Sequence, residues 1–298
     1  MGELAVAPAA SGAAEHTAAP LLHITYYTDP LCSWSWAFEP QWRRLRYELG
    51  DQLGWRYCMG GMIPDWQHFS DPLNDVSRPM QMGPQWYQVS ALSGMPLNDA
   101  IWFTNPPDSS YPACLAVKAA EQQGAAVGEC YLRRLRRAVM VEGRNIAAQA
   151  VLLAAGEETP GLDPARLRRD LESEQTRETF RNDLKEVRWR QIGRFPTLIL
   201  RHHAGKSIII VGYRPYEVLH EAIGALAPEL ELRPPLPKPA DALTAYVRHW
   251  GEVTTREAAE LMDGDRDVAM RELAALATAG VVRRVEVAQV RQPLWAAN

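Results

Sequence analysis

The stretch Thr28-Asp29-Pro30-Leu31-Cys32-Ser33-Trp34-Ser35-Trp36 separates two segments with different hydrophobic patterns. Before it, residues 21–27 form a short apolar and β-prone run, which predicts a buried strand. After it, residues 33–49 predict a helix, and residues 53–59 predict a second strand that ends before two glycines. A strand, a helix and a strand in this order are typical of a βαβ crossover.

Cys32 lies where the first predicted strand ends and the helix begins. Unpaired backbone N–H groups and the helix dipole favour an anion at such a position, so we expect an acidic thiol. A thiolate is the attacking species in disulfide exchange, which makes Cys32 the candidate nucleophile. An ordinary half-buried cysteine fits the same spacing and remains the alternative.

Phe195-Pro196-Thr197 is the second distinctive feature. It lies at the start of a predicted strand over residues 194–200, which a turn joins to residues 207–211 as a β-hairpin. Proline is tolerated at the first position of a strand. A cis bond before Pro196 would bend the chain sharply, whereas a trans bond is the commoner form. A helix over residues 216–227 follows.

A helical block is predicted between these two features. Residues 62–110 are rich in Pro, Met, Trp and Asn with little periodicity, so we expect irregular chain packed by its own large side chains. Seven of the ten tryptophans lie between Trp34 and Trp102. Helices are then predicted at about residues 112–123, 130–142, 147–155 and 164–186. The four arginines of residues 133–137 predict a solvated helix face.

The two ends of the chain differ from its middle. Residues 1–20 are rich in Ala and Pro and carry acidic residues before any basic one, which predicts a disordered tail and no secretory signal. No run of apolar residues is long enough for a transmembrane helix, so we expect a cytoplasmic protein. Residues 233–239 predict a stiff proline-rich linker.

Residues 240–298 predict a small separate module. Its predicted elements are helices at 242–250, 255–262 and 267–279 and strands at 281–287 and 290–295, an order that resembles a winged helix. Thr254 and Glu257 have the spacing of a capping box. Nine Asp and Glu against seven Arg give the module a charge of −2, and the whole chain carries −4. We therefore expect a protein-contact or dimerisation module and no nucleic-acid partner, with backbone contact through Arg283 and Arg284 as the alternative.

Together these features resemble the DsbA-like branch of the thioredoxin superfamily over residues 21–227. In that branch the active-site motif follows the first strand, a helical domain interrupts the fold, and a cis-proline begins a later strand facing the motif. The resemblance implies an α/β thioredoxin-like domain over residues 21–232, with a helical insertion at about 62–190. Four short motifs resemble cytosolic FrnE-type oxidoreductases and YjbH-type adaptors of the Spx regulator: Asp29-Pro30-Leu31-Cys32, Gly60-Gly61-Met62, Ser110-Tyr111-Pro112 and Glu142-Gly143-Arg144-Asn145-Ile146.

The family's redox motif is C-x-x-C, whereas this chain has Cys32-Ser33-Trp34-Ser35. Cys32 can attack a disulfide or accept glutathione, but no neighbouring thiol can release the adduct. The leading expectation is therefore monothiol exchange or glutathione-linked chemistry, with Ser35 donating a hydrogen bond to the thiolate. The resemblance implies substrate contacts from Ser33, Trp34, Phe195, Pro196 and Thr197. No bound cofactor is expected, and glutathione would be a co-substrate.

Other thiols and metal ligands are sparse in the sequence. Cys58, near the end of the second predicted strand, is the candidate resolving thiol, while Cys114 and Cys130 fit ordinary packed or surface positions. The four cysteines form no C-x-x-C pair. His202-His203 lies in a predicted turn without a cysteine or carboxylate at ligand spacing, so no metal site is expected.

Two other functions remain open at this point. The same groove could hold a segment of a client protein, which would make the chain a non-catalytic adaptor of the Spx-adaptor type. A kappa-type glutathione transferase or isomerase would instead use Ser33 or Ser35. The partner would be a protein or peptide thiol or disulfide in the first reading and a client protein in the second, and the sequence does not indicate the oligomeric state.

Overall fold

A computed structural model describes residues 20–231, 239–288, 290 and 292–298. The predicted tail over residues 1–20 and the predicted linker over 233–239 therefore lie outside the described residues, except for Pro20 and Pro239. Among the helices of the described part, none combines the length and the apolar character needed to cross a membrane.

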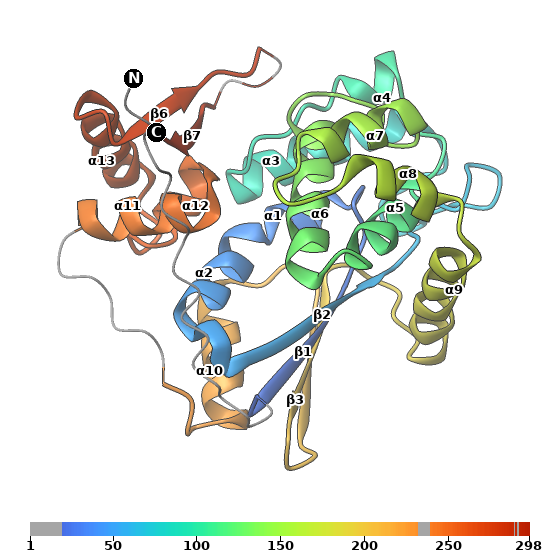
Figure 1. Ribbon diagram of the computed structural model, residues 1–298, viewed down its shortest axis with the longest axis horizontal. Helices are drawn as coiled ribbons and strands as arrows, with labels where there is room; N and C mark the ends of the chain where they lie inside the picture. The colour runs from blue at the N-terminus through green and yellow to red at the C-terminus, as the bar shows by residue number, and fades with distance from the viewer. Residues whose placement is uncertain (1–19, 232–238, 289, 291) are drawn as a thin grey trace, which may run out of the picture.

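The core of the fold is a four-stranded sheet in the order β2-β1-β3-β4 (Figure 1). Its strands are β1 (Leu22–Thr28), β2 (Leu53–Met59), β3 (Thr197–His202) and β4 (Ser207–Val211). β1 runs parallel to β2, and β3 is antiparallel to both β1 and β4. Both the predicted crossover and the predicted hairpin are confirmed, and they give the thioredoxin-like α/β sheet.

The predicted helix over residues 33–49 is two helices, α1 (Ser33–Ala37) and α2 (Glu39–Leu49). They meet at Phe38, where Pro40 occupies the first turn of α2. Proline has no N–H to donate to the preceding turn, so one continuous hydrogen-bond ladder cannot pass this point. The short 3-10 helix η1 (Gly50–Gln52) then leads into β2.

The prediction of irregular chain over residues 62–110 is wrong in part. The segment contains the 3-10 helix η2 (Pro79–Gln81) and the helices α3 (Met82–Ser93) and α4 (Ile101–Thr104). Pro84 does not break α3, because it lies in the first turn, where backbone N–H groups have no partner within the helix. α3 has no charged residue, so the periodicity that usually marks a helix is weak.

The remaining helices of the insertion are α5 (Tyr111–Glu121), α6 (Ala125–Met140), α7 (Gln149–Glu157), α8 (Pro164–Leu171) and α9 (Glu174–Trp189). The predicted helix over 164–186 is divided between α8 and α9. The break lies at Ser173, whose side chain accepts a hydrogen bond from the Thr176 N–H and caps α9. After β4, α10 (Tyr216–Leu226) closes the thioredoxin-like part.

The C-terminal module contains α11 (Pro239–Trp250), β5 (Glu252–Thr254), α12 (Thr255–Ala259), α13 (Arg266–Thr278), β6 (Val282–Val285) and β7 (Leu294–Ala297). Its antiparallel sheet has the order β5-β7-β6. β5 was not expected, because three residues are too few to show a strand period. The predicted capping box of Thr254 and Glu257 is confirmed.

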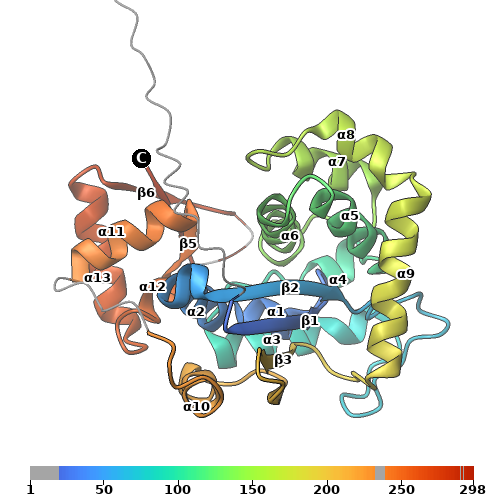
Figure 2. The ribbon, with the colours of Figure 1, turned by 60° about the horizontal axis from the view of Figure 1, so that its bottom comes forward.

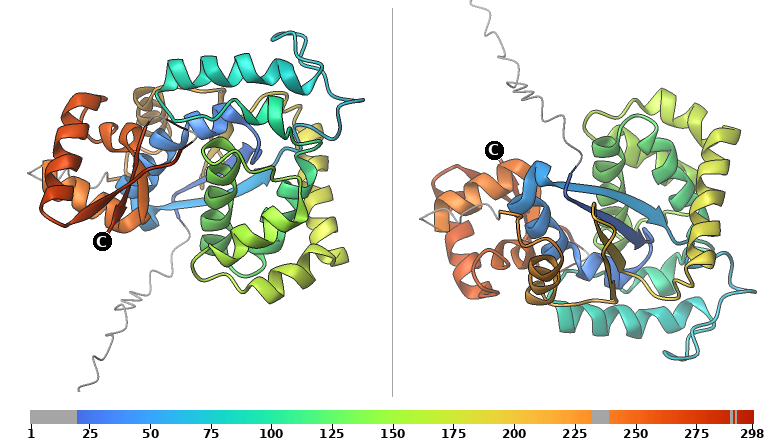
Figure 3. Two further views of the ribbon diagram at one scale, coloured as in Figure 1. Left: turned by 90° about the horizontal axis from the view of Figure 1, so that it is seen from above. Right: turned by 90° about the horizontal axis from the view of Figure 1, so that it is seen from below.

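The C-terminal module lies at one end of the molecule beside α2, and α8 and α9 lie at the other end (Figures 2 and 3). One buried and two half-buried arginines join the module to the rest. Arg43 of α2 and Arg133 of α6 both contact the Glu257 carboxylate, at 2.8 and 2.9 Å. Arg137 contacts Glu252 at 3.0 Å.

The solvated face predicted for residues 133–137 is therefore wrong. Arg136 is fully buried, and it contacts Glu39 and the Thr28 hydroxyl, directly before the Cys32 motif. Partners that lie far away in the sequence explain how so many arginines are accommodated in the interior, because a buried charge needs an opposite charge or hydrogen bonds.

Candidate functional site

Cys32 and the Phe195–Pro196 segment meet at one edge of the sheet. Cys32 is the N-cap residue of α1, and its Sγ accepts a hydrogen bond from the Ser35 N–H at 3.4 Å. The thiol in turn lies 3.6 Å from the Phe195 carbonyl oxygen, to which it donates. The Phe195–Pro196 peptide bond is cis. The structure thus brings together two features that are more than 160 positions apart in the sequence.

The environment of Cys32 does not favour a thiolate. The residue is 4% exposed, and burial raises the pKa of its thiol, an effect that hydrogen bonding from Ser35 offsets only in part. The expectation of an acidic thiol is therefore wrong. α1 has five residues, so its dipole is short, and the carbonyl of Phe195 accepts from a protonated thiol but repels a thiolate.

The other predicted residues of the motif are close to Cys32 but differ in exposure. Ser33 and Ser35 are buried, and Trp34 is half-buried against Tyr213, with ring centroids 5.7 Å apart. Among the described residues, the Ser35 hydroxyl has no hydrogen-bond partner with ordinary geometry, so the backbone N–H is the donor that reaches the sulfur. Thr197 is buried in β3, in register with Tyr27 and Val211.

Asp29 organises the site, and sequence reasoning did not assign it a role. Its carboxylate is fully buried and accepts hydrogen bonds from the N–H groups of Leu31 and Met62 at 2.8 and 2.7 Å. The Ser110 hydroxyl and the Cys114 thiol also donate to it, at 2.8 and 3.3 Å. Burial raises the pKa of Asp29, and these hydrogen bonds counter the rise.

Three of the four short motifs in the sequence therefore converge on one carboxylate. Asp29, Met62 and Ser110 each come from a different motif. The signal in the sequence is that all three motifs belong to the same family resemblance, which favours a shared site. The fourth motif, residues 142–146, follows α6. Its Glu142 pairs with Arg134 of α6, and its Arg144 pairs with Glu158 at the C-terminal end of α7.

Gly60 allows the chain to close over the site. A Cβ atom at this position would lie 2.1 Å from the ring of Phe195, so the ring packs directly on the glycine backbone. Gly61 has a φ of +58° and would also bring a Cβ within 2.7 Å of Leu184. Close packing against Phe195 thus explains Gly60, whereas the positive φ and the contact with Leu184 explain Gly61.

Cys32 forms no disulfide with any of the other three cysteines. Cys58 packs in a small cluster with Tyr27, Val187 and Ile199, separate from the main core. Its Sγ lies 3.7 Å from the Asp183 carbonyl oxygen. Burial raises the pKa of the Cys58 thiol far above its usual range. The Cys114 thiol donates a hydrogen bond to Asp29, and Cys130 is exposed on α6. The role of Cys58 as resolving thiol stays a prediction without support from these contacts.

Glu229, which has no ligand spacing to His202-His203 in the sequence, lies beside them in space. The hydrogen bond between His202 Nε2 and Glu229 Oε1 is 2.7 Å long. This cluster is at the far end of β3 from Pro196 and is separate from the Cys32 site.

Comparisons with known proteins agree with this geometry. A family profile described as thioredoxin matches residues 26–221. The ClpXP adapter protein SpxH of Halalkalibacterium halodurans is 26% identical over 258 residues, covering 85% of this chain and 81% of that protein. A putative protein disulfide isomerase from Nitrosomonas europaea has a TM-score of 0.58 at 22% identity, and covers 68% of this chain and 96% of its own. The cytosolic disulfide reductase DsbM from Pseudomonas aeruginosa has a TM-score of 0.51 at 25% identity, with coverages of 63% and 88%.

The two kinds of similar protein differ in how much of this chain they match. The match to the adapter protein spans 258 residues, whereas only 239 residues precede the C-terminal module. The match therefore extends into the module. The disulfide isomerase structure, in contrast, aligns over almost its whole length, but about a third of this chain has no counterpart in it.

Proposed function

The chain belongs to the thioredoxin family, and from that premise we propose that it is a non-catalytic adaptor that presents a client protein to the ClpXP protease. The client would be a regulator of the Spx type, bound on the side of the molecule that carries Cys32. Such an adaptor would act in the cytoplasm.

One observation carries this proposal. The similarity to proteins named ClpXP adapters runs through the thioredoxin-like part and into the C-terminal module. A chain whose only task was thiol exchange would have no use for a second module fixed rigidly to the first. Here Arg43, Arg133 and Arg137 hold that module through buried or half-buried ion pairs, so two binding surfaces keep a constant geometry.

The state of the Cys32 thiol supports an adaptor over an enzyme. Its low exposure hinders attack on a disulfide, and its raised pKa leaves little thiolate at neutral pH. None of the other described cysteines makes a hydrogen bond to it that could mark a resolving pair. The motif then has a structural role, and its rim of Trp34, Phe195 and Tyr213 remains available for a client.

An apolar surface beside the motif is suited to hold a client. We define the α3 face as Met80, Tyr87, Leu92 and Phe103, which are 63, 69, 66 and 54% exposed. Exposed large apolar side chains that gather in one place mark interaction surfaces. α3 packs directly on α1, the helix that begins after Cys32, so the α3 face lies on the helix next to the one that carries the motif.

For the C-terminal module we propose a winged-helix-like contact module for a protein partner. The arginines that point inward to Glu257 belong to the other part of the chain, and the module contributes acidic groups to that contact. With a net charge of −2 it lacks the basic surface that nucleic-acid backbones require.

The test is a reconstituted degradation assay with ClpXP and an Spx-type client. The wild-type chain should accelerate client loss. The double variant Tyr87→Ser/Leu92→Ser should weaken client binding by about thirtyfold or more, since each substitution removes about 1–2 kcal/mol of apolar contact. Trp189→Ser is the matched control, because Trp189 is 76% exposed on α9. Failure of the wild-type chain to bind the client or to accelerate its loss would refute the proposal.

Monothiol exchange at Cys32 is the second candidate. The Ser35 N–H directed at the sulfur favours it. It requires an opening of the Phe195 segment, and it would be seen as turnover of a glutathione mixed disulfide. Kappa-type transfer by Ser33 or Ser35 has less support, since both side chains are buried.

A further inference from the structure

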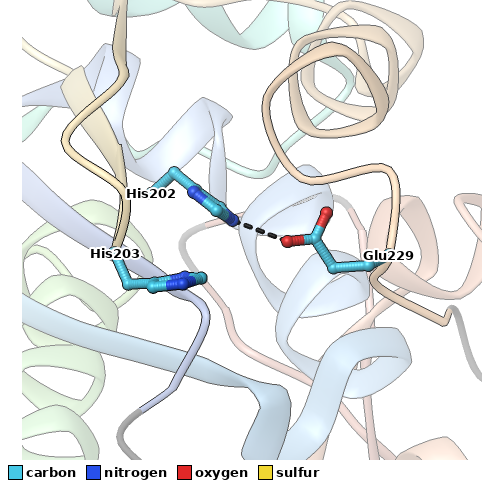
Figure 4. A group of neighbouring side chains, drawn as sticks. All are labelled: His202, His203 and Glu229. Carbon is cyan, nitrogen blue, oxygen red and sulfur yellow. Dashed lines mark hydrogen bonds and ion pairs between the residues drawn. The ribbon is translucent and has the colours of Figure 1, made fainter.

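Three side chains that can ligate a metal meet at the end of the sheet farthest from Cys32 (Figure 4). His202 ends β3, His203 begins the turn to β4, and Glu229 follows α10. We propose that they form a binding site for a divalent transition-metal ion, with Zn²⁺ as the preferred ion. The proposal does not depend on the adaptor function.

The ligand atoms are already close to coordinating positions. One donor atom from each of the three residues lies within 4.8 Å of the others. Zinc bonds of about 2.0–2.2 Å place two ligands of one ion roughly 3–3.5 Å apart. The 2.7 Å contact between His202 and Glu229 must therefore open slightly to admit the ion. Glu229 and His203 are exposed and can rotate, whereas the side chain of His202 is only 10% exposed and provides the fixed point.

The fold places these residues by simple rules. Successive side chains of a strand alternate between faces, so His202 shares a face with Leu198 and Leu200, which are buried in the main core. The His203 N–H donates to the Leu21 carbonyl at 2.9 Å, which fixes the start of the turn. A turn after α10, closed by the hydrogen bond from Leu230 N–H to the Ala227 carbonyl, presents Glu229. Three separate segments thus hold the backbone of the site.

The imidazole ring of His202 must change its tautomer when a metal ion binds. The Ala204 N–H donates to Nδ1 of His202 at 3.2 Å, which assigns the ring proton to Nε2, facing Glu229. An ion bound at Nε2 replaces that proton, Nδ1 then becomes the protonated nitrogen, and the N–H of exposed Ala204 turns to water. The cost is one weak hydrogen bond at the surface.

The donor set decides the class of ion. Two imidazole nitrogens and one carboxylate oxygen suit Zn²⁺ and its neighbours in the first transition row, whereas Mg²⁺ and Ca²⁺ require oxygen ligands. Three protein ligands leave a fourth position for water. Bound metal would tie the β3–β4 turn to the segment after α10 and stabilise the folded chain.

The chain contains a natural control for this site. His68 and Asp65 form an exposed pair with the same 2.7 Å separation as His202 and Glu229. Among the described residues no third ligand joins that pair. If a histidine beside a carboxylate were sufficient, the two pairs would bind metal equally well.

The experiment is calorimetric titration of ZnCl₂ into the full, metal-stripped chain. Wild type and His68→Asn should bind with the same affinity at the proposed site, and the double variant His203→Asn/Glu229→Gln should bind at that site at least about tenfold more weakly. The two substituted residues are exposed, so the fold should be kept, which thermal unfolding without metal verifies. Zn²⁺ should raise the unfolding temperature of the wild type more than that of the double variant.

Co²⁺ provides a second, independent readout. Visible absorption of a four-coordinate Co²⁺ site should develop in wild type and be lost in the double variant. Absence of Zn²⁺ binding to the wild type would overturn the proposal. So would equal affinity and stoichiometry in the double variant, because the ion would then be held by other histidines of the chain.

Discussion

The guanidinium of Arg43 and the carboxylate of Glu257 lie 2.8 Å apart where α2 meets α12, with their side chains 5% and 0% exposed. The same carboxylate accepts from Arg133 at 2.9 Å and from the Thr254 N–H at 2.7 Å. A single residue therefore caps α12 and binds two arginines from different helices of the thioredoxin-like part. This relationship explains how a module of a few dozen residues is held in one orientation.

Glu257→Gln should destabilise the chain by about 3–5 kcal/mol, because it leaves the buried Arg43 and the half-buried Arg133 without their counter-charge. Urea unfolding followed by tryptophan fluorescence measures the loss. Glu286→Gln is the matched control in the same module, since its ion pair with Arg284 is exposed and should change stability by less than about 0.5 kcal/mol. Equal effects of the two substitutions would show that the Glu257 contacts do not hold the module.

The stability of the chain should also depend on pH through Glu257. Burial alone would raise the pKa of this carboxyl, but Arg133 and Arg43 lower it to about 2 from an ordinary value of 4.5. A lowered carboxyl pKa contributes stability that is complete above the ordinary value and is lost as pH falls through the folded value. Unfolding temperatures measured between pH 5 and 2 should therefore fall more steeply for the wild type than for Glu257→Gln. Parallel curves would contradict this assignment.

Gly60→Ala should disturb the contact between the Cys32 site and the cis-proline segment. The new methyl group would meet the Phe195 ring at 2.1 Å, and overpacking of this kind costs about 1–3 kcal/mol. Thermal unfolding measures the cost. Gly193→Ala serves as control, since nothing lies within 4 Å of a Cβ there. If Gly60→Ala were as stable as the control, Phe195 would not be packed as described.

Alkylation should distinguish the four cysteines by their surroundings. Cys130 is exposed, whereas Cys32, Cys58 and Cys114 are buried. In the native protein, iodoacetamide should therefore label Cys130 well before Cys32, as read by mass spectrometry of the peptides. Faster labelling of Cys32 would mean that its thiol is accessible and activated, and it would favour monothiol exchange over an adaptor.

Much of the fold could be predicted from local pattern. The strands over residues 53–59 and 207–211 and the capping box at Thr254 follow from short-range rules, and the structure confirms them. The errors arose where long-range contacts decide the outcome. The arginines of α6 look solvated in the sequence because their partners, such as Glu39 and Glu257, are about a hundred positions away.

The site shows the same division. The resemblance to DsbA-like proteins implies that the Cys32 motif faces Pro196, and the contact between Cys32 and Phe195 agrees with it. The sequence does not show the burial that raises the thiol pKa, nor the four donors that gather on Asp29. The burial of Cys32 and the donors to Asp29 both depend on which side chains the helical insertion places next to the motif. The spacing of residues in the sequence does not predict those contacts.

The most direct test of the account is the ClpXP degradation assay with Cys32→Ser, which keeps the side-chain shape but removes thiol chemistry. An adaptor predicts client degradation at the wild-type rate within about twofold, with Cys130→Ser as the control for loss of a thiol elsewhere. Loss of client binding or of accelerated degradation in Cys32→Ser alone would contradict the central claim. It would show that the function of this protein requires the Cys32 thiol.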